Sequence, residues 1–166
     1  MSVIGAGTAL EPTTEALCLE LGRRAVEAGF RIASGGLGGV MAAVSRGAHR
    51  ASSYREGDVL GILPSYDPES ANPDVDIAVP TGLGYARNLV LVSMADVVVA
   101  VEGGSGTLSE LALAWQLGKP IVALRGVGGW SERLAGEALD EKRPGRIESA
   151  DSAEEAVALA LGLLSG

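Results

Sequence analysis

The chain has 166 residues, 47% of them hydrophobic, which is the size of one domain with a substantial core. We therefore expect residues 1–166 to form a single nucleotide-binding-like domain. The net charge of −8 argues against a nucleic-acid partner, because such binding draws most of its affinity from neutralised phosphates.

Short apolar runs alternate with segments of helical periodicity along the chain. In chain order the pattern predicts a strand at 3–4, a helix at 12–28, a strand at 30–34, a helix at 38–51, strands at 58–64 and 76–80, a helix at 85–95, a strand at 96–101, a helix at 108–117, a strand at 120–124 and a helix at 152–164. The strand segments are apolar throughout, which is typical of parallel strands covered on both faces. The sequence thus predicts an α/β fold, a Rossmann-like doubly wound parallel sheet with helices on both faces.

Nothing in the sequence indicates a membrane partner or a secretory leader. No apolar run approaches the roughly 18 to 20 residues that a membrane-spanning helix needs. The first residues, MSVIGAG, lack the basic and apolar regions of a signal peptide. We therefore expect a cytoplasmic protein.

Three glycine-bearing segments follow predicted strands, where folds of this kind bind their ligands. They are GAGT at 5–8, SGGLGG at 34–39 and EGGSGT at 102–107. Glycine lets the backbone approach a ligand, and free amides at a helix start attract an anion. One such loop is explained by a simple turn from strand to helix, but two dense loops indicate a phosphate site. The candidate phosphate-binding or nucleotide-binding residues are Gly5, Gly7, Ser34, Gly35, Gly36, Gly38, Gly39, Gly103, Gly104, Ser105, Gly106 and Thr107.

Several other kinds of cofactor site are not supported by the sequence. The glycines are not followed by Gly-Lys-Ser/Thr, so a P-loop is not predicted. GAGTAL lacks the third glycine of the dinucleotide fingerprint, and no acidic residue ends the second strand, so the sequence disfavours an NAD site. His49 is the only histidine, which removes histidine triads and most zinc sites, and we predict no metal. Lys119 and Lys142 lie away from the loops and offer no place for a pyridoxal Schiff base.

Two charged residues near the loops are candidates for chemistry. Arg87 precedes the apolar residues Val90, Leu91 and Met94 at helical spacing, which predicts that its side chain faces inward. A buried guanidinium requires an anion, either a structural carboxylate or a bound phosphate. Glu110 follows the third glycine segment, where a carboxylate can stabilise a ribosyl oxocarbenium ion and orient an attacking water.

Two of these residues and one tryptophan also have structural alternatives. The spacing of Thr107 and Glu110 fits a capping box, in which the two side chains only satisfy amides at a helix start. Trp130 follows the last apolar strand, where an indole ring either stacks on a base or pterin or covers apolar surface. The residues themselves leave both alternatives open.

The segments SGGLGGVM, TGLGYARN and EGGSGTLSE together resemble the superfamily of Lonely Guy-type phosphoribohydrolases and molybdenum-cofactor carrier proteins, formerly mislabelled lysine decarboxylases. The hallmark of that superfamily is Pro-Gly-Gly-x-Gly-Thr-x-x-Glu, preceded by an arginine in a Glu-Arg-Lys context. The residues that match the hallmark are Gly103, Gly104, Gly106, Thr107 and Glu110, with Arg87 as the preceding arginine.

This resemblance implies that Arg87 and Glu110 are a catalytic pair that cleaves the N-glycosidic bond of a nucleoside 5′-monophosphate to free base and ribose 5-phosphate. It also implies a homo-oligomer, at least a dimer, with no required cofactor. The chain departs from the hallmark in two places, with Glu102 in place of the proline and Ala-Arg-Asn in place of Glu-Arg-Lys. These departures resemble the carrier branch, which implies a non-catalytic carrier or sensor of a phosphorylated ligand, with molybdenum cofactor as cargo. A structural domain whose loops bind nothing is a third hypothesis, which the clustering of the motifs disfavours.

Overall fold

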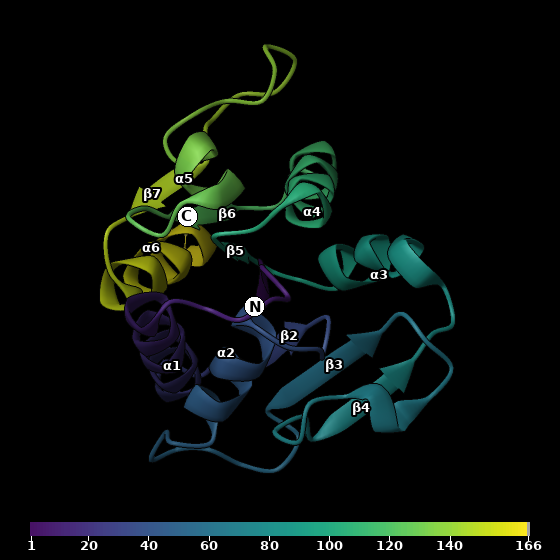
Figure 1. Cartoon of the computed structure of the whole chain (residues 1–166). Helices are drawn as coiled ribbons and strands as arrows, with labels where there is room; N and C mark the ends of the chain where they lie inside the picture. The colour runs from purple at the N-terminus through teal and green to yellow at the C-terminus, as the bar shows by residue number, and fades with distance from the viewer. Residues whose placement is uncertain (166) are drawn as a thin grey trace.

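A seven-stranded, all-parallel sheet forms the centre of the computed structural model, which describes residues 1–165 (Figure 1). The strands are β1 (Ser2–Gly5), β2 (Ile32–Ser34), β3 (Val59–Leu63), β4 (Ile77–Pro80), β5 (Val98–Val101), β6 (Ile121–Leu124) and β7 (Glu148–Ala150). Their order across the sheet is β4-β3-β2-β1-β5-β6-β7. The chain runs outward from β1 in one direction, returns to the centre at β5 and runs outward in the other. The predicted doubly wound fold is therefore confirmed.

Helices cover both faces of this sheet. They are α1 (Pro12–Glu27), α2 (Val40–Ala48), α3 (Arg87–Ser93), α4 (Ser105–Gln116), α5 (Gly129–Leu134) and α6 (Ala153–Ser165), with 3-10 turns η1 (Pro68–Ser70) and η2 (Gly84–Ala86). Alternate strand residues point to opposite faces, so Val3 and Val99 pack with α1, α2 and α6, which gather on one side in Figure 1. Ile4 and Val98 pack with α3, α4 and α5 on the other face. Two separate cores result, one on each side of the sheet.

The central strands are buried on both faces. Every residue of β5 is 0% exposed, and Val3 and Ile4 of β1 are 0% and 1% exposed. Full burial of a valine or isoleucine side chain contributes roughly 1.5 to 3 kcal/mol relative to leaving it exposed. This burial explains why the sequence of β5 shows no alternation of apolar and polar residues.

Some elements differ from those predicted from the sequence. The helix α4 begins at Ser105, earlier than the predicted start at 108, and α3 is shorter than predicted because η2 precedes it. The sequence pattern does not predict α5 or β7. The strand β7 has the sequence Glu-Ser-Ala and no apolar run, so only its pairing with β6 at the sheet edge defines it.

Within residues 1–165, no helix combines the length and the apolar character needed to cross a membrane. The cytoplasmic location expected from the sequence stays a prediction.

The strand order reverses between β1 and β5. These neighbouring strands end at Gly5 and Val101, which pair with each other. The loop after β1 leads to α1 on one face of the sheet, and the loop after β5 leads to α4 on the opposite face. A crevice opens at such a reversal, and doubly wound proteins bind their ligands there. The fold thus brings the first and third glycine segments to the position where a ligand is expected.

Candidate functional site

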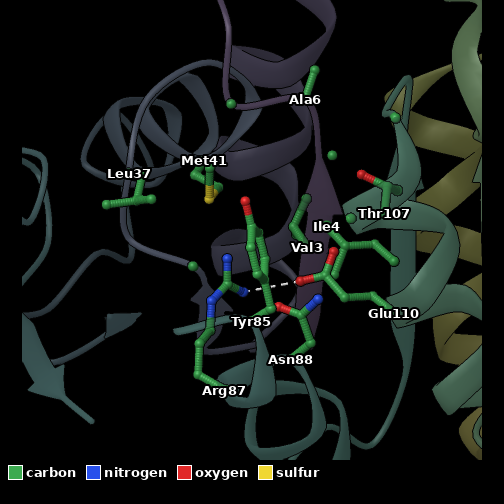
Figure 2. Close-up of a pocket in the computed structure, with 15 residues that line it drawn as sticks. Val3, Ile4, Ala6, Leu37, Met41, Tyr85, Arg87, Asn88, Thr107 and Glu110 are labelled. Atoms are coloured by element: carbon green, nitrogen blue, oxygen red, sulfur yellow. Dashed lines mark hydrogen bonds and ion pairs between the residues drawn. The ribbon is translucent and has the colours of Figure 1, made fainter. Parts of the chain in front are cut away.

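A cavity of about 220 Å³ lies at this reversal point. Its walls come from β1 and the loop after it, the loop after β2 with the start of α2, the segment η2–α3, and the start of α4 (Figure 2). The lining residues are Val3, Ile4, Gly5, Ala6, Gly7, Gly35, Leu37, Met41, Tyr85, Arg87, Asn88, Gly104, Gly106, Thr107 and Glu110. Residues that the sequence analysis selected from three separate glycine segments and from the third helix therefore share one cavity.

Arg87 and Glu110 form a buried ion pair in the wall of this cavity. Nη1 of Arg87 donates a hydrogen bond to Oε1 of Glu110 over 2.9 Å, and the two side chains are only 12% and 7% exposed (Figure 2). Arg87 is the first residue of α3 and Glu110 lies in α4, and these helices pack against each other on the same face of the sheet. The pair therefore exists only because of the tertiary contact between the two helices.

The carboxyl group of Glu110 has an unusual affinity for protons. Burial raises the pKa of Glu110 to about 7, although the Arg87 guanidinium acts in the opposite direction. Protonated and ionised forms of Glu110 both exist near neutral pH, a property suited to general acid-base chemistry. Nε of Arg87 is buried and has no hydrogen-bond partner within residues 1–165, so the guanidinium keeps unused donor capacity.

The guanidinium of Arg87 also lies against the loop after β2. A Cβ atom at Gly35 would stand 2.5 Å from Nη2 of Arg87 and 2.8 Å from Sδ of Met41, so this close approach requires glycine. The inward direction predicted for Arg87 is confirmed, but the reasoning behind it was partly wrong. Val90 in α3 and Met94 directly after it are exposed, whereas α3 contacts the core through Leu91 and Val92.

The third glycine segment forms the start of α4. Because α4 begins at Ser105, Thr107 lies inside its first turn and Glu110 lies in its second turn. The N-cap residue is Gly104, which has no side chain to make a capping hydrogen bond. The capping-box alternative is therefore wrong, and Glu110 pairs with Arg87 instead. Gly103 has a φ of 96°, and a side chain there would overlap Thr107. The first amides of a helix have no partners within it and, with the helix dipole, favour an anion.

The second glycine segment contributes less to the cavity than predicted. Oγ of Ser34 accepts a hydrogen bond from the Gly36 amide over 3.1 Å, and Gly39 packs against carbonyl groups of the loop after β1. These residues hold the backbone of the turn. The predicted binding residues that line the cavity are Gly5, Gly7, Gly35, Gly104, Gly106 and Thr107, and those that do not are Ser34, Gly36, Gly38, Gly39, Gly103 and Ser105.

Sequence reasoning missed the apolar and polar side chains that complete the wall. Leu37 and Met41 line the side formed by the second segment, and Tyr85 and Asn88 flank Arg87 in the sequence YARN. Tyr85 is 90% exposed, whereas Asn88 is only 4% exposed. Their closeness to Arg87 in the sequence was the signal that could have identified them. Trp130 does not line the cavity, because it lies in α5 and packs against the core on that face of the sheet.

The chain matches the SLOG cluster4 family over residues 1–157. Among curated proteins it is similar to a probable cytokinin riboside 5′-monophosphate phosphoribohydrolase, LOG4, of Oryza sativa subsp. japonica, with 33% identity over 132 residues. That alignment covers 74% of this chain and 55% of the rice protein. The chain therefore spans about half the length of this relative.

Two solved structures of molybdenum-cofactor proteins are similar over nearly their whole length. The molybdenum cofactor binding protein of Rippkaea orientalis has 34% identity and a TM-score of 0.83, and the comparison covers 98% of this chain and 95% of that chain. The molybdenum cofactor carrier protein of Chlamydomonas reinhardtii has 30% identity and a TM-score of 0.81, with 99% and 98% covered. The likeness thus includes proteins whose names describe hydrolysis and proteins whose names describe binding.

Proposed function

Because the chain belongs to the SLOG cluster4 family, we propose that it is a phosphoribohydrolase that cleaves nucleoside 5′-monophosphates. This family lies in the superfamily of Lonely Guy-type phosphoribohydrolases and molybdenum-cofactor carrier proteins. The observation that carries the proposal is the buried Arg87–Glu110 pair, which lines a cavity at the reversal point of the sheet. A charged pair in a cavity is stronger evidence of a functional site than a charged pair in a core, because a ligand can reach the pair in the cavity.

The proposed reaction replaces the N-glycosidic bond with a bond to water. As the bond between C1′ and the base nitrogen breaks, positive charge develops on the ribosyl ring, and an ionised Glu110 stabilises it. The same carboxylate accepts a proton from the attacking water, whose oxygen forms the new bond to C1′. The base leaves with the bonding electron pair and takes up a proton, and ribose 5-phosphate remains. Arg87 orients Glu110 through the 2.9 Å hydrogen bond.

The remaining lining residues suit the two ends of such a substrate. We assign the phosphate to the amides at the start of α4, near Gly104, Gly106 and Thr107, where the helix dipole favours negative charge. The base lies on the side of Tyr85, Leu37 and Met41, which offer an aromatic ring and apolar surface. Tyr85 thus takes the stacking role that was one of the two alternatives open for Trp130 from the sequence.

The direct test is incubation of the pure protein with AMP, GMP, CMP and UMP, followed by separation of the free bases. We expect one or more bases to be released together with an equal amount of ribose 5-phosphate. The corresponding nucleosides, which lack the phosphate, are the matched control and should be poor substrates. Absence of base release from all four monophosphates would reject the hydrolase.

A non-catalytic carrier of a phosphorylated pterin, such as molybdenum cofactor as cargo, is the second candidate. It is favoured by the similarity to two molybdenum-cofactor proteins over 98% and 99% of this chain. The cavity contains the same phosphate-suited helix start and the exposed ring of Tyr85 in either case. Pterin fluorescence and stoichiometric molybdenum in the purified protein, without base release, would support the carrier.

We further propose that the protein is a homo-oligomer, at least a dimer, that associates through α3 and α4. The exposed apolar side chains here are Leu89 and Val90 of α3, Met94 directly after α3, and Leu117 after α4. Residues 88–95 and 105–117 include one charged residue, Glu110, and it is buried. A net charge of −8 disfavours contact between charged faces of two copies, so this uncharged face is the best suited. Sedimentation of the wild type and of Leu89→Asp tests this, and a monomeric wild type would reject it.

A further inference from the structure

The side chain of Asn88 is held in one orientation next to the Arg87–Glu110 pair. Oγ of Ser109 donates its single proton to the carbonyl oxygen of Gly106 over 2.7 Å. The Ser109 oxygen therefore acts only as an acceptor toward Asn88, 2.8 Å away. The atom of Asn88 that faces Ser109 must be the donor Nδ2, and Oδ1 faces the other way.

This orientation leaves Oδ1 of Asn88 as an acceptor without a donor. No hydrogen bond within residues 1–165 uses Oδ1, although Asn88 is 4% exposed and lines the cavity. Figure 2 shows the Asn88 amide beside the contact between the guanidinium of Arg87 and the carboxyl group of Glu110. The buried side-chain atoms without a hydrogen-bond partner within residues 1–165 include Nε of Arg87 but not this oxygen, so Oδ1 is open to the cavity. A ligand that displaces water from Oδ1 must supply a donor or leave the acceptor unpaired at a cost in free energy.

We infer that Asn88 recognises a sugar hydroxyl of the ligand and thereby makes the site selective for ribose over deoxyribose. This inference rests on the proposed function, since it concerns the sugar of the same monophosphate. Oδ1 of Asn88 and the carboxylate of Glu110 are two acceptors in the wall of the same cavity, and the vicinal hydroxyls of ribose are two donors on adjacent carbon atoms. A phosphate or an aromatic ring face offers no such donor. A deoxy sugar leaves one acceptor unpaired, which is the situation that sites of this kind reject most strongly.

Ser109 is a positioning residue in this arrangement, because it acts on the ligand only through Asn88. Without the Ser109 oxygen, the Asn88 amide loses the contact that distinguishes its nitrogen from its oxygen. Ser109 itself is exposed, so its replacement removes no buried packing. Gln116, also exposed on α4 and outside the cavity, provides a control position.

The experiment compares kcat/KM for the best of the four monophosphates with its 2′-deoxy and 3′-deoxy analogues. Wild type should prefer the ribonucleotide over at least one analogue by about 10- to 100-fold, the effect of one unpaired buried acceptor. Asn88→Ala should lose most of this preference, because its kcat/KM should fall for the ribonucleotide and stay unchanged for the disfavoured deoxy analogue. Ser109→Ala should reduce the preference in part, and Gln116→Ala should retain it. Calorimetry with ribose 5-phosphate and 2-deoxyribose 5-phosphate gives the same comparison without turnover.

The outcomes separate this inference from the function on which it rests. If the wild type handles the ribonucleotide and both deoxy analogues equally, Asn88 does not recognise a hydroxyl, while the hydrolase proposal stands. An unchanged preference in Asn88→Ala overturns the inference in the same way. If neither the monophosphates nor ribose 5-phosphate bind at all, the proposed function fails first and takes the inference with it. Should Asn88→Ala not fold, Ser109→Ala carries the test.

Discussion

Replacing Glu110 with glutamine removes one charge from the buried pair and changes little else. Glutamine has nearly the same shape, and its side-chain oxygen can still accept the hydrogen bond that Nη1 of Arg87 now donates to Glu110 over 2.9 Å. The amide cannot accept a proton from water or stabilise an oxocarbenium ion as a carboxylate does. We expect Glu110→Gln to lower base release by at least about 10²-fold while nucleoside monophosphate binding persists.

The stability of this variant should depend on pH in a direction set by the raised pKa. The carboxyl of Glu110 ionises near its ordinary 4.5 in the unfolded chain but near 7 in the folded protein. Between these values the unfolded state loses the proton first, so the wild-type protein loses stability as pH rises, by roughly 3 kcal/mol in total. Glutamine does not titrate. The free energy of unfolding of the wild type, relative to that of Glu110→Gln, should therefore be highest below pH 4.5 and lowest above pH 7.

Urea unfolding of both proteins at pH 5 and pH 8 measures this change, and base release at pH 8 measures the chemistry. If the wild type and Glu110→Gln differ in unfolding free energy by the same amount at pH 5 and at pH 8, the pKa of Glu110 is not raised. A Glu110→Gln variant that keeps most of an active wild type's turnover would refute the catalytic assignment. If the wild type itself releases no base, the carrier proposal takes over.

Three further changes test the surroundings of the pair. Arg87→Ala should weaken ligand binding strongly. At pH 6 its loss of stability should be below the roughly 3 to 5 kcal/mol typical of a broken buried pair, because Glu110 can protonate, and at pH 8 the loss should be larger. Equal losses at both pH values in urea unfolding would contradict this. Gly35→Ala should displace the guanidinium of Arg87 and reduce activity about 10-fold or more with a modest loss of stability, since the atoms nearest to an added Cβ belong to the side chains of Arg87 and Met41. Tyr85→Ala should raise the KM or Kd by about 10-fold without a measurable change in Tm, because the ring is 90% exposed, and an unchanged affinity would remove Tyr85 from the ligand site.

The sequence by itself determined the fold class and the segments from which the site is built. The apolar strands and periodic helices are local patterns, so the doubly wound sheet and the approximate position of each long element followed from them. Glycine-rich turns after strands are also local, and they identified the loops near Gly35 and Gly104 that line the cavity. Short elements without a pattern, such as β7, depend on a neighbouring strand and were not predictable.

The tertiary structure alone decided which residues meet and what chemical state they have. Arg87 and Glu110 belong to different helices, and only the packing of α3 against α4 brings them to 2.9 Å. The competing capping box was ruled out by the start of α4 at Ser105, which depends on how the chain leaves β5. The orientation of Asn88 likewise follows from its contact with Ser109 of α4, and the 90% exposure of Tyr85 is a property of the assembled fold. The raised pKa of Glu110 has the same origin, because burial is a property of the assembled fold and has no counterpart in the sequence around the residue.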